Sequence, residues 1–330
     1  MNSIFKEITG YDRPLNILCF NTHERYETHL SQTNNIFYAW NHPQMKKWKT
    51  DFAPIPKNYI QLNQALDTAQ LPEWADIDLV LSQQKFGQYQ LGIQISKQLD
   101  VPLISMEHTL PIHSWDKKRL DDLRNMRGDL NIFLSEFSQR AWQWEDKQDT
   151  TIIPAAVDSK FFRPDDRQVQ DKSKHILSIV NDWKERDYFC GYSIWQRITK
   201  NLPIKVRGIN TGFSTPTKTP EELLEEYRNA RIFLNTSVWS SCPYTLLEAM
   251  ATGCAVVTTA TTMLPDIVTN GYNGLISNDE DTLRKHLETL LNDDDMCQEL
   301  GKNARKTVME RFSLENFVNS WETAFKKVLR

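Results

Sequence analysis

The segment 240–276 combines residue types that can hold an anionic ligand. It reads SSCPYTLLEAMATGCAVVTTATTMLPDIVTNGYNGLI, with an apolar helix pattern, a glycine, a buried-strand pattern and a proline-marked loop. The helix pattern follows Cys242-Pro243. The unpaired N–H groups and the dipole at a helix N-terminus favour an anion there. We therefore predict a phosphate on the backbone amides of Tyr244, Thr245 and Leu246.

Glu248 lies one turn into the same predicted helix. A carboxylate at that position can accept hydrogen bonds from the diol of a ribose. The local pattern fits equally well a capped helix that carries a solvated glutamate. Both interpretations stay open on these residues alone.

The elements that would position these residues form two alternating α/β series. In the first half, short apolar runs of strand length occur at 15–20, 78–82, 101–105 and 130–135, and a helical pattern covers 88–99. Proline-marked residues 152–166 then separate this half from a second series, with strand patterns at 175–180, 202–208, 231–235 and 254–259. Such alternation predicts parallel sheets with helices on both faces.

Two helices of the second half have well-defined starts. Thr219-Pro220-Glu221-Glu222 predicts a helix N-terminus in which Thr219 caps, Pro220 occupies the first turn and Glu222 completes a capping box. The last helix pattern follows Ser313 and places its apolar residues on one face. Open parallel sheets bind ligands at the carboxyl ends of their strands, so we expect the site in a cleft between two such domains.

Composition limits the class of protein. The chain has 330 residues, which favours two domains, and its 40% hydrophobic and 25% charged residues are ordinary for a globular protein. Five scattered cysteines favour free thiols and the cytoplasm over a disulfide framework or a zinc site. We expect no signal peptide and no transmembrane segment, because no run of 18 apolar residues occurs. The net charge of -4 argues against strong nonspecific nucleic-acid binding.

Three motifs, LLEAMATGCAVVTT, LPDIV and NGYNGLI, resemble the donor-binding signature of the retaining glycosyltransferase family 4, the glycosyl transferases group 1. The segment IIPAAVDSKFFRP is similar to the interdomain segment of that family. ARKTVMERFSLENFVNSWETAFKKVL resembles its terminal helix. The match is specific over 152–330 and covers only the pattern of elements over 1–151.

This resemblance implies the GT-B fold, an α/β architecture of two Rossmann-like domains that face a central cleft. The first domain would comprise 1–158 and a returning helix at 314–330, and the donor-binding domain would comprise 159–313. The implied activity is transfer of a sugar from a nucleotide-diphosphate sugar to a hydroxyl acceptor, with retention at the anomeric carbon. The resemblance implies no required cofactor and no metal.

The implied donor-site residues depart from the family in two places. The glutamate that holds the ribose falls on Glu248, whereas the glutamate that contacts the donor sugar is replaced by Ser240. The family's arginine and lysine for the diphosphate fall on Asn181 and Arg186, with Lys184 nearby. Arg186 is the implied catalytic cation, because a positive charge stabilises the leaving phosphate. Gly208 would let the backbone approach the base.

In the first domain, the resemblance places a histidine after a central strand, near the reacting sugar, and His108 holds that position. A structural histidine is the alternative. The family's glycine-rich loop after the first strand is replaced by CFNTHERYE. Asn21, His23 and Arg25 in that segment are the acceptor-side candidates.

Other hypotheses remain open on the sequence. The departures at Asn181 and Ser240 would also fit an inactive nucleotide-sugar-binding homologue, and a nucleotide-sugar epimerase of the same fold is a third option. The acceptor could be a glycan, a lipid-linked molecule or a modified base in DNA. Lys46, Lys47 and Lys49 lie beside Trp40 and Trp48, where a base or a sugar ring could stack. The oligomeric state and the donor sugar are not specified.

Overall fold

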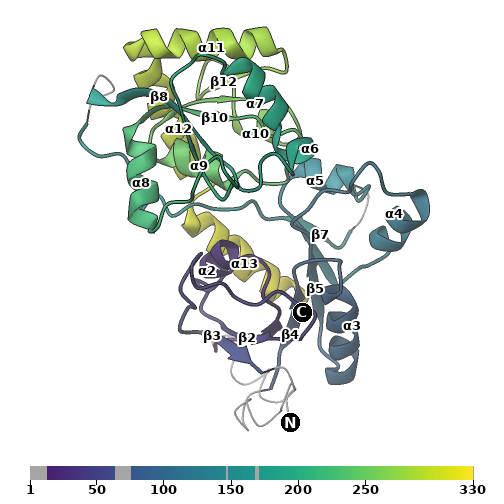
Figure 1. Cartoon of the computed structure of the whole chain (residues 1–330). Coiled ribbons are helices and arrows are strands. Elements are labelled where there is room, and N and C mark those ends of the chain that lie inside the picture. Colours follow the sequence, from purple (N-terminus) through teal and green to yellow (C-terminus); the bar gives the residue numbers. More distant parts are fainter. Residues whose placement is uncertain (1–12, 64–75, 146–147, 168–170, 330) are drawn as a thin grey trace. The chain divides into compact units, whose positions relative to one another are not determined.

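The structure is a computed structural model that describes residues 13–63, 76–145, 148–167 and 171–329. The chain divides into two compact units. Unit 1 comprises Met1–Pro154 and Phe317–Arg330, and unit 2 comprises Ala155–Asn316. Both units are built on parallel sheets with helices (Figure 1).

Unit 1 contains a seven-stranded parallel sheet in the order β3-β2-β1-β4-β5-β6-β7. Its core includes Leu18, Tyr38, Val80 and Leu103 from neighbouring strands. The strands and helices of this unit are β1 (Asn16–Cys19), α2 (Glu24–Leu30), β2 (Ile36–Trp40), β3 (Tyr59–Leu62), β4 (Leu79–Ser82), α3 (Gln88–Leu99), β5 (Leu103–Met106), α4 (Lys117–Arg124), β6 (Leu130–Phe133), α5 (Glu136–Ala141), β7 (Thr150–Ile152) and most of α13 (Leu314–Val328).

Unit 2 contains a five-stranded parallel sheet in the order β12-β11-β10-β8-β9. Residues of its strands and of α7, α11 and α12 share one hydrophobic core. Its elements are β8 (Ser173–Ile179), α6 (Asp187–Cys190), α7 (Tyr192–Ile198), β9 (Ile204–Arg207), α8 (Pro220–Asn229), β10 (Ala230–Asn235), α9 (Tyr244–Ala251), β11 (Ala255–Thr258), α10 (Leu264–Ile267), β12 (Leu275–Ile276), α11 (Glu280–Asn292) and α12 (Asp294–Arg311).

The terminal helix α13 has the apolar face that its spacing predicts. Phe317, Trp321 and Phe325 are buried, and Ala324 lies among them. The indole of Trp321 donates a hydrogen bond of 3.0 Å to the hydroxyl of Tyr26 on α2. This contact fixes α13 beside α2, in the unit that holds the N-terminal half of the chain.

Two sequence predictions about elements need correction. The predicted strands of the first half omit β2 and β3, which form one edge of the seven-stranded sheet, and β7, which forms the other edge. Thr219 caps α8 as predicted, because its side chain accepts from the amide of Glu222. The carboxylate of Glu222, however, accepts from the amide of Lys218 at 2.7 Å, so the capping box with Thr219 is not completed.

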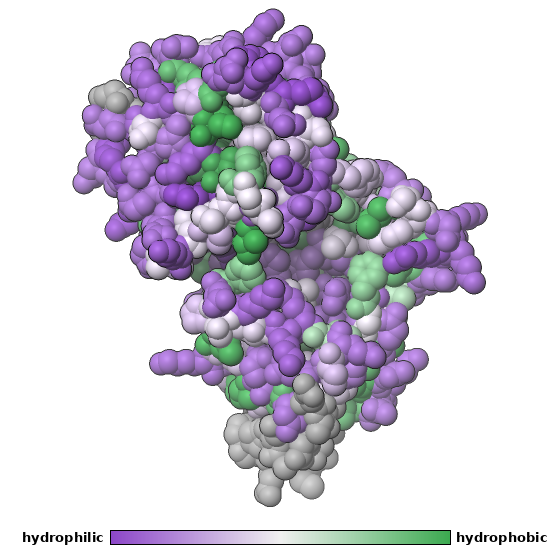
Figure 2. Space-filling model, viewed as in Figure 1, coloured by the Kyte–Doolittle hydropathy of each residue, from purple (hydrophilic) through white to green (hydrophobic). Residues whose placement is uncertain are grey.

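The hydrophilic character of the surface agrees with the ordinary globular composition of the chain. The face drawn in Figure 2 is mostly hydrophilic, with its hydrophobic residues in small separate groups. Among the described residues, no helix has both the length and the apolar character that crossing a bilayer requires. All five cysteines are free thiols.

Candidate functional site

The strand order of unit 2 places its switch point between β8 and β10. These two strands are neighbours, and β9 and β11 lie on their outer sides. Because chain connections leave in opposite directions there, the carboxyl ends of the two strands border a crevice that binds ligands in open α/β sheets. The residues after β8 include Asn181, Lys184 and Arg186, and the residues after β10 include Ser240. The tertiary structure thus gathers the predicted donor residues at one switch point.

Direct hydrogen bonds join the two segments at this point. The amides of Val238 and Trp239 both donate to the carbonyl of Phe189 on α6, at 2.9 and 3.1 Å. The hydroxyl of Thr236 donates to the carbonyl of Cys190 at 3.1 Å. The half-buried Ser240 immediately follows Trp239. The segment that carries Arg186 and the segment that carries Ser240 are therefore held together.

Asn181 and Gly208 organise the ends of β8 and β9. The side-chain Oδ1 of Asn181 accepts from the amide of Ile209 at 2.8 Å. Gly208 has φ +124°, and a Cβ there would lie 2.0 Å from the carbonyl oxygen of Val180. Only glycine permits this approach of two backbones. Asn181 thus has a structural role beside any contact with a donor.

The two cations after β8 have different surroundings. The ammonium of Lys184 lies 5.7 Å from the ring centre of Tyr192 and 5.8 Å from that of Phe213, a cation–π arrangement. The exposed Arg186 donates through Nη1 to the carbonyl of Asn181 at 3.5 Å. Arg186 is therefore the cation that can turn toward a diphosphate without leaving an aromatic contact.

Helix α9 begins at Tyr244, directly after Cys242-Pro243, as predicted. The backbone amides of its first turn differ in their hydrogen-bond partners. The amides of Leu246 and Leu247 donate to the carbonyl of Pro243 at 3.0 and 3.2 Å. The Leu246 amide would have to give up that bond to hold a phosphate. The predicted phosphate position therefore moves to the amides of Tyr244 and Thr245, which precede it on the helix.

Glu248 is not the solvated residue that the local pattern allowed. It is 1% exposed, and its Oε2 accepts from the hydroxyl of Tyr227 on α8 at 2.8 Å. A buried carboxylate that receives a hydrogen bond is held in one orientation, which is a property of binding residues rather than of a solvated helix face.

The switch point of unit 1 lies between β1 and β4. His23 follows β1, Gln83 follows β4, and His108 follows the adjacent strand β5. The rings of His23 and His108 are stacked, with centroids 6.1 Å apart, and the Tyr26 ring meets His108 edge-on at 4.7 Å. The acceptor-side candidates His23 and His108 therefore share one cluster.

Gln83 and burial determine the charge state of His108. The Nε2 of His108 lies 3.1 Å from the amide oxygen of Gln83, which can only accept, so Nε2 carries the proton. Desolvation and the positive charges of His23 and Lys46 lower the pKa of His108 to about 3. His108 is thus neutral at physiological pH and presents a hydrogen bond donor to Gln83.

A buried glutamate orients Gln83 in turn. The side-chain amide nitrogen of Gln83 donates to Oε1 of Glu27 at 3.0 Å, and the amide of Thr22 donates to the same oxygen at 2.8 Å. Glu27 is fully buried. Burial raises its pKa to about 8, so the carboxyl is protonated at neutral pH. The sequence does not reveal this Glu27–Gln83–His108 chain.

The remaining acceptor-side candidates differ in their environments. His23 caps α2 by accepting from the amide of Tyr26, and desolvation together with the charges of Lys46 and Arg25 lowers its pKa. Arg25 is half-buried beside it. The side-chain amide of the buried Asn21 donates to the oxygens of Asn41 and Gln61 at 2.9 and 2.8 Å. Asn21 therefore joins strand ends, and its role toward an acceptor stays a prediction.

The basic cluster at 46–49 does not form a stacking surface. Lys46 pairs with Glu24 at 2.6 Å and donates to the carbonyl of Thr22. The indole of Trp48 donates to the carbonyl of Ala53 at 2.7 Å and packs on Tyr59, 5.2 Å away. These internal contacts give no support to a modified DNA base as the acceptor.

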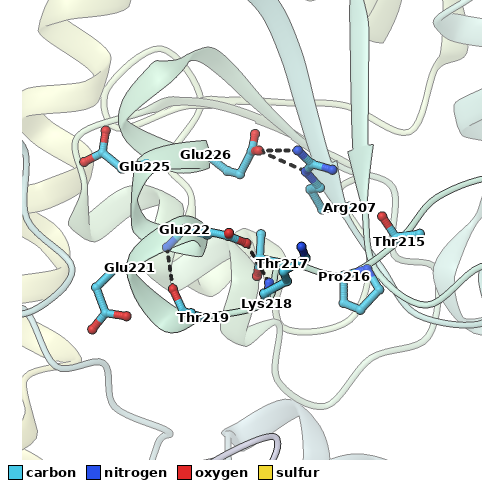
Figure 3. A pocket seen from close by; sticks show the side chains of 10 residues that line it. All are labelled: Arg207, Thr215, Pro216, Thr217, Lys218, Thr219, Glu221, Glu222, Glu225 and Glu226. Atoms are coloured by element: carbon cyan, nitrogen blue, oxygen red, sulfur yellow. Dashed lines mark hydrogen bonds and ion pairs between the residues drawn. The ribbon is translucent and has the colours of Figure 1, made fainter.

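A cavity of unit 2 does not coincide with the predicted donor residues. It has a volume of 630 Å³ and lies between β9 and α8 (Figure 3). Its lining includes four glutamates, and Arg207 is paired with Glu226 at 2.6 Å. An acidic cavity is a poor environment for a diphosphate. Among the described residues, no group of three or more His, Cys, Asp or Glu side chains could hold a metal ion.

Three residues that form hydrogen bonds within the candidate site were not found from the sequence, namely Tyr227, Gln83 and Glu27. Tyr227 is 21 positions from Glu248, and Gln83 is 25 positions from His108. Residues so far apart in the sequence show no spacing pattern that would predict their contact. The contact can be predicted only when the arrangement of the strands and helices is known. The one available signal was that Gln83 directly follows a buried strand.

Comparisons with known proteins show which proteins the chain resembles in sequence and in fold. Residues 199–307 match the family model described as glycosyl transferases group 1. HepE from Anabaena, solved with UDP and glucose, has a TM-score of 0.75 at 13% identity and covers 95% of this chain and 100% of its own. Sucrose-phosphate synthase from Thermosynechococcus elongatus has a TM-score of 0.71 at 16% identity, covering 95% and 98%. The predicted α/β fold of the GT-B glycosyltransferases is confirmed.

Curated relatives match at higher identity over shorter stretches. N-acetyl-alpha-D-glucosaminyl L-malate synthase from Bacillus anthracis is 29% identical over 170 residues, which is 50% of this chain and 43% of that protein. Poly(ribitol-phosphate) alpha-N-acetylglucosaminyltransferase from Staphylococcus aureus (strain COL) is 27% identical over 137 residues, 40% and 27% of the two chains. The chain spans less than half the length of these relatives. The chain is thus similar to glycosyl transferases group 1 over residues 199–307.

Proposed function

We propose that this protein is a retaining glycosyltransferase that uses a nucleotide-diphosphate sugar as its donor. The observation that carries the proposal is the meeting of two segments at the switch point of unit 2. One segment brings Arg186 and the other leads through Ser240 into α9 and Glu248. A cation, a helix N-terminus and a buried carboxylate are suited to a diphosphate and its ribose.

In this mechanism the donor's diphosphate lies at the start of α9, on the amides of Tyr244 and Thr245, and Glu248 accepts from the ribose hydroxyls. Arg186 stabilises the negative charge that builds on the leaving phosphate. The bond from the anomeric carbon to the phosphate oxygen breaks while the acceptor oxygen bonds the same face of that carbon. The acceptor's proton passes to the departing phosphate, so no carboxylate nucleophile and no metal is required.

Within unit 2, Ser240 is proposed to contact the transferred sugar, and within unit 1, His108 is proposed as a catalytic residue. Neutral His108 offers hydrogen bonds without adding positive charge. Ser240 stands where the family carries a glutamate, so it supplies a hydroxyl in place of a carboxylate. UDP-N-acetylglucosamine is the donor to test first, because two relatives are named for N-acetylglucosaminyl groups and HepE was solved with UDP. The free thiols fit a reducing compartment and support the cytoplasm as the location.

The test is protection against thermal unfolding by a panel of nucleotide sugars. A donor at about 100 times its Kd should add roughly 2.7 kcal/mol of stability. We expect one donor to protect the wild type and to lose this effect in Glu248→Ala and Arg186→Ala. Lys200→Ala is the matched control, because Lys200 is an exposed cation of the same unit, outside the site.

Activity is then measured with the protecting donor and a panel of hydroxyl acceptors. L-malate and ribitol phosphate are the first acceptors to test, since they appear in the names of the relatives. NMR of the product's anomeric proton reports retention. Protection without transfer to any acceptor, and without slow donor hydrolysis, would favour the inactive binding homologue. No protection by any donor would remove the proposed donor site itself.

A further inference from the structure

A second cavity of unit 2 lies at the opposite edge of the sheet from the proposed donor site. Its volume is 260 Å³. Lys172 precedes β8, Arg228 is near the end of α8 before β10, and Gly253 lies just before β11. These are the amino ends of the strands. The cavity is lined by Pro164, Asp165, Arg167, Lys172, Arg228, Thr252, Gly253, Gln298, Gly301, Lys302 and Arg305.

The lining is strongly basic, with five cations and one carboxylate. Two of the cations are neutralised by two carboxylates, because Arg167 and Arg228 pair with Glu225 at 2.8 and 2.9 Å and both also pair with Asp165. Lys172, Lys302 and Arg305 have no carboxylate within ion-pair distance among the residues that the structure describes. Three positive charges therefore remain uncompensated around one small cavity.

Arg305 is held in place by backbone groups. Its Nη1 donates to the carbonyls of Ala251 and Phe162. Desolvation, together with the charge of Arg163, lowers the pKa of Arg305. An arginine that is half-buried without a counter-ion gains from an anion, because the anion replaces the lost solvation of the guanidinium.

Two glycines make the cavity floor from backbone. A Cβ on Gly301 would lie 2.2 Å from the carbonyl oxygen of Gly253, so α12 packs directly on the turn that follows α9. A Cβ on Gly253, in contrast, would meet nothing closer than 3.8 Å, so that side of the turn is open. The floor is formed by the closely packed backbone of Gly253 and Gly301, and the charged side chains line the same cavity.

The basic residues could instead serve only to offset the negative ends of α8 and α9. Each helix end is equivalent to roughly half an elementary charge. Arg228 already stands in the last turn of α8. Three further uncompensated cations exceed what two such ends require, so charge balance favours an additional anion.

We propose that this cavity binds a compact phosphate-bearing anion, at a site separate from the donor site. Its volume is below the roughly 300–1,000 Å³ typical of pockets for larger ligands, so it suits inorganic phosphate, diphosphate or a small phosphomonoester. Arginine and lysine together provide the bidentate and point-charge contacts that phosphate oxygens prefer. The site adjoins Thr252, which hydrogen-bonds the carbonyl of Glu248, so the bound anion would contact the far end of the helix that carries Glu248.

The test uses the full chain and inorganic phosphate and diphosphate, titrated at constant ionic strength against potassium chloride. Binding is followed by thermal unfolding and by broadening of the ³¹P NMR signal. We expect saturable protection in the wild type and at least tenfold weaker binding in a Lys172→Gln, Lys302→Gln double variant. Lys306→Gln is the matched control, one turn further along α12 and paired with Glu310 at 4.0 Å.

The outcomes separate this site from the donor site. Phosphate binding that persists in Arg186→Ala and Glu248→Ala but falls in the double variant supports the proposal, whether or not any nucleotide sugar binds. Loss of phosphate binding in Arg186→Ala instead would assign the anion to the donor site and overturn it. The proposal also fails if chloride protects as well as phosphate, or if the double variant loses basal stability and no phosphate effect exists in the wild type.

Discussion

The buried carboxyl of Glu27 should control how the stability of unit 1 depends on pH. Its pKa is raised from an ordinary value of 4.5 to about 8 by burial, and Glu27 is 0% exposed. The unfolded chain therefore loses this proton at lower pH than the folded chain. The stability that the protonated form supplies is complete below pH 4.5 and is lost as pH rises through about 8.

Glu27→Gln removes this dependence while keeping an oxygen that can accept from Thr22 and Gln83. A difference of about 3.5 pH units at about 1.4 kcal/mol per unit gives a change on the order of 5 kcal/mol between pH 4.5 and pH 8.5. For a unit of this size that corresponds to a relative shift in Tm of roughly 10 °C. The stability of Glu27→Gln relative to the wild type should therefore increase as the pH rises.

The assay is thermal unfolding of both proteins at half-unit steps from pH 5 to 8.5, with ¹³C NMR of the Glu27 carboxyl carbon. Glu24→Gln is the control on the same helix. Burial raises the pKa of Glu24, but hydrogen bonds from Lys46 and Lys49 outweigh it and lower that pKa. Glu24 therefore stabilises above its unfolded pKa, and its loss should destabilise at neutral pH. Parallel profiles for wild type and Glu27→Gln, or an ionised Glu27 at pH 6, would refute the reasoning.

Three further predictions follow from single contacts. Gly208→Ala should lower the free energy of unfolding of unit 2 by about 2 kcal/mol or more in urea, because its Cβ would strike the carbonyl of Val180, whereas Gly212→Ala, with no atom within 4 Å, should cost about 1 kcal/mol. An equal cost for both would contradict this. Tyr227→Phe should weaken nucleotide binding in calorimetry about fivefold or more, since Glu248 loses a hydrogen bond worth about 1–3 kcal/mol; unchanged affinity would remove Tyr227 from the site. Gln83→Leu should lower kcat while leaving the Kd of the donor unchanged, because the imidazole ring of His108 loses the hydrogen bond that orients it. An equal loss of donor affinity would count against a role of Gln83 in positioning His108.

Much of the fold could be predicted because its signals are local. Helix α3 has the bounds 88–99 that its pattern predicts, and the buried strands β4, β6 and β11 fall within the predicted apolar runs, while β10 begins one residue before its run. Thr219 and Pro220 mark the start of α8, since capping depends only on residues within one turn. Strands β2 and β3 were not predicted, although β2 reads IFYAW, an apolar run of strand length; in the sheet β2 pairs with β1, and β3 pairs with β2.

The candidate site likewise contains features that the sequence could predict and features that depend on tertiary contacts. Sequence alone proposed the residue types at the donor loop, since Arg186 and Glu248 belong to motifs that are continuous in the chain. It left open whether Glu248 is solvated, because the answer depends on Tyr227 from another helix. It also proposed Asn21 as an acceptor-side residue, whereas the hydrogen bonds of its side chain at the strand ends depend on the tertiary structure.

The sequence by itself therefore determined the α/β class, the positions of most strands and helices, and the motifs that end at the strand termini, because these depend on periodicity and on neighbours within a few residues. Only the tertiary structure decided which termini meet, how Gln83 and Glu27 fix the proton on His108, and that Lys172, Lys302 and Arg305 surround one cavity. Those properties depend on strand order and burial, which bring together residues from distant parts of the chain and set the free energy of their charges.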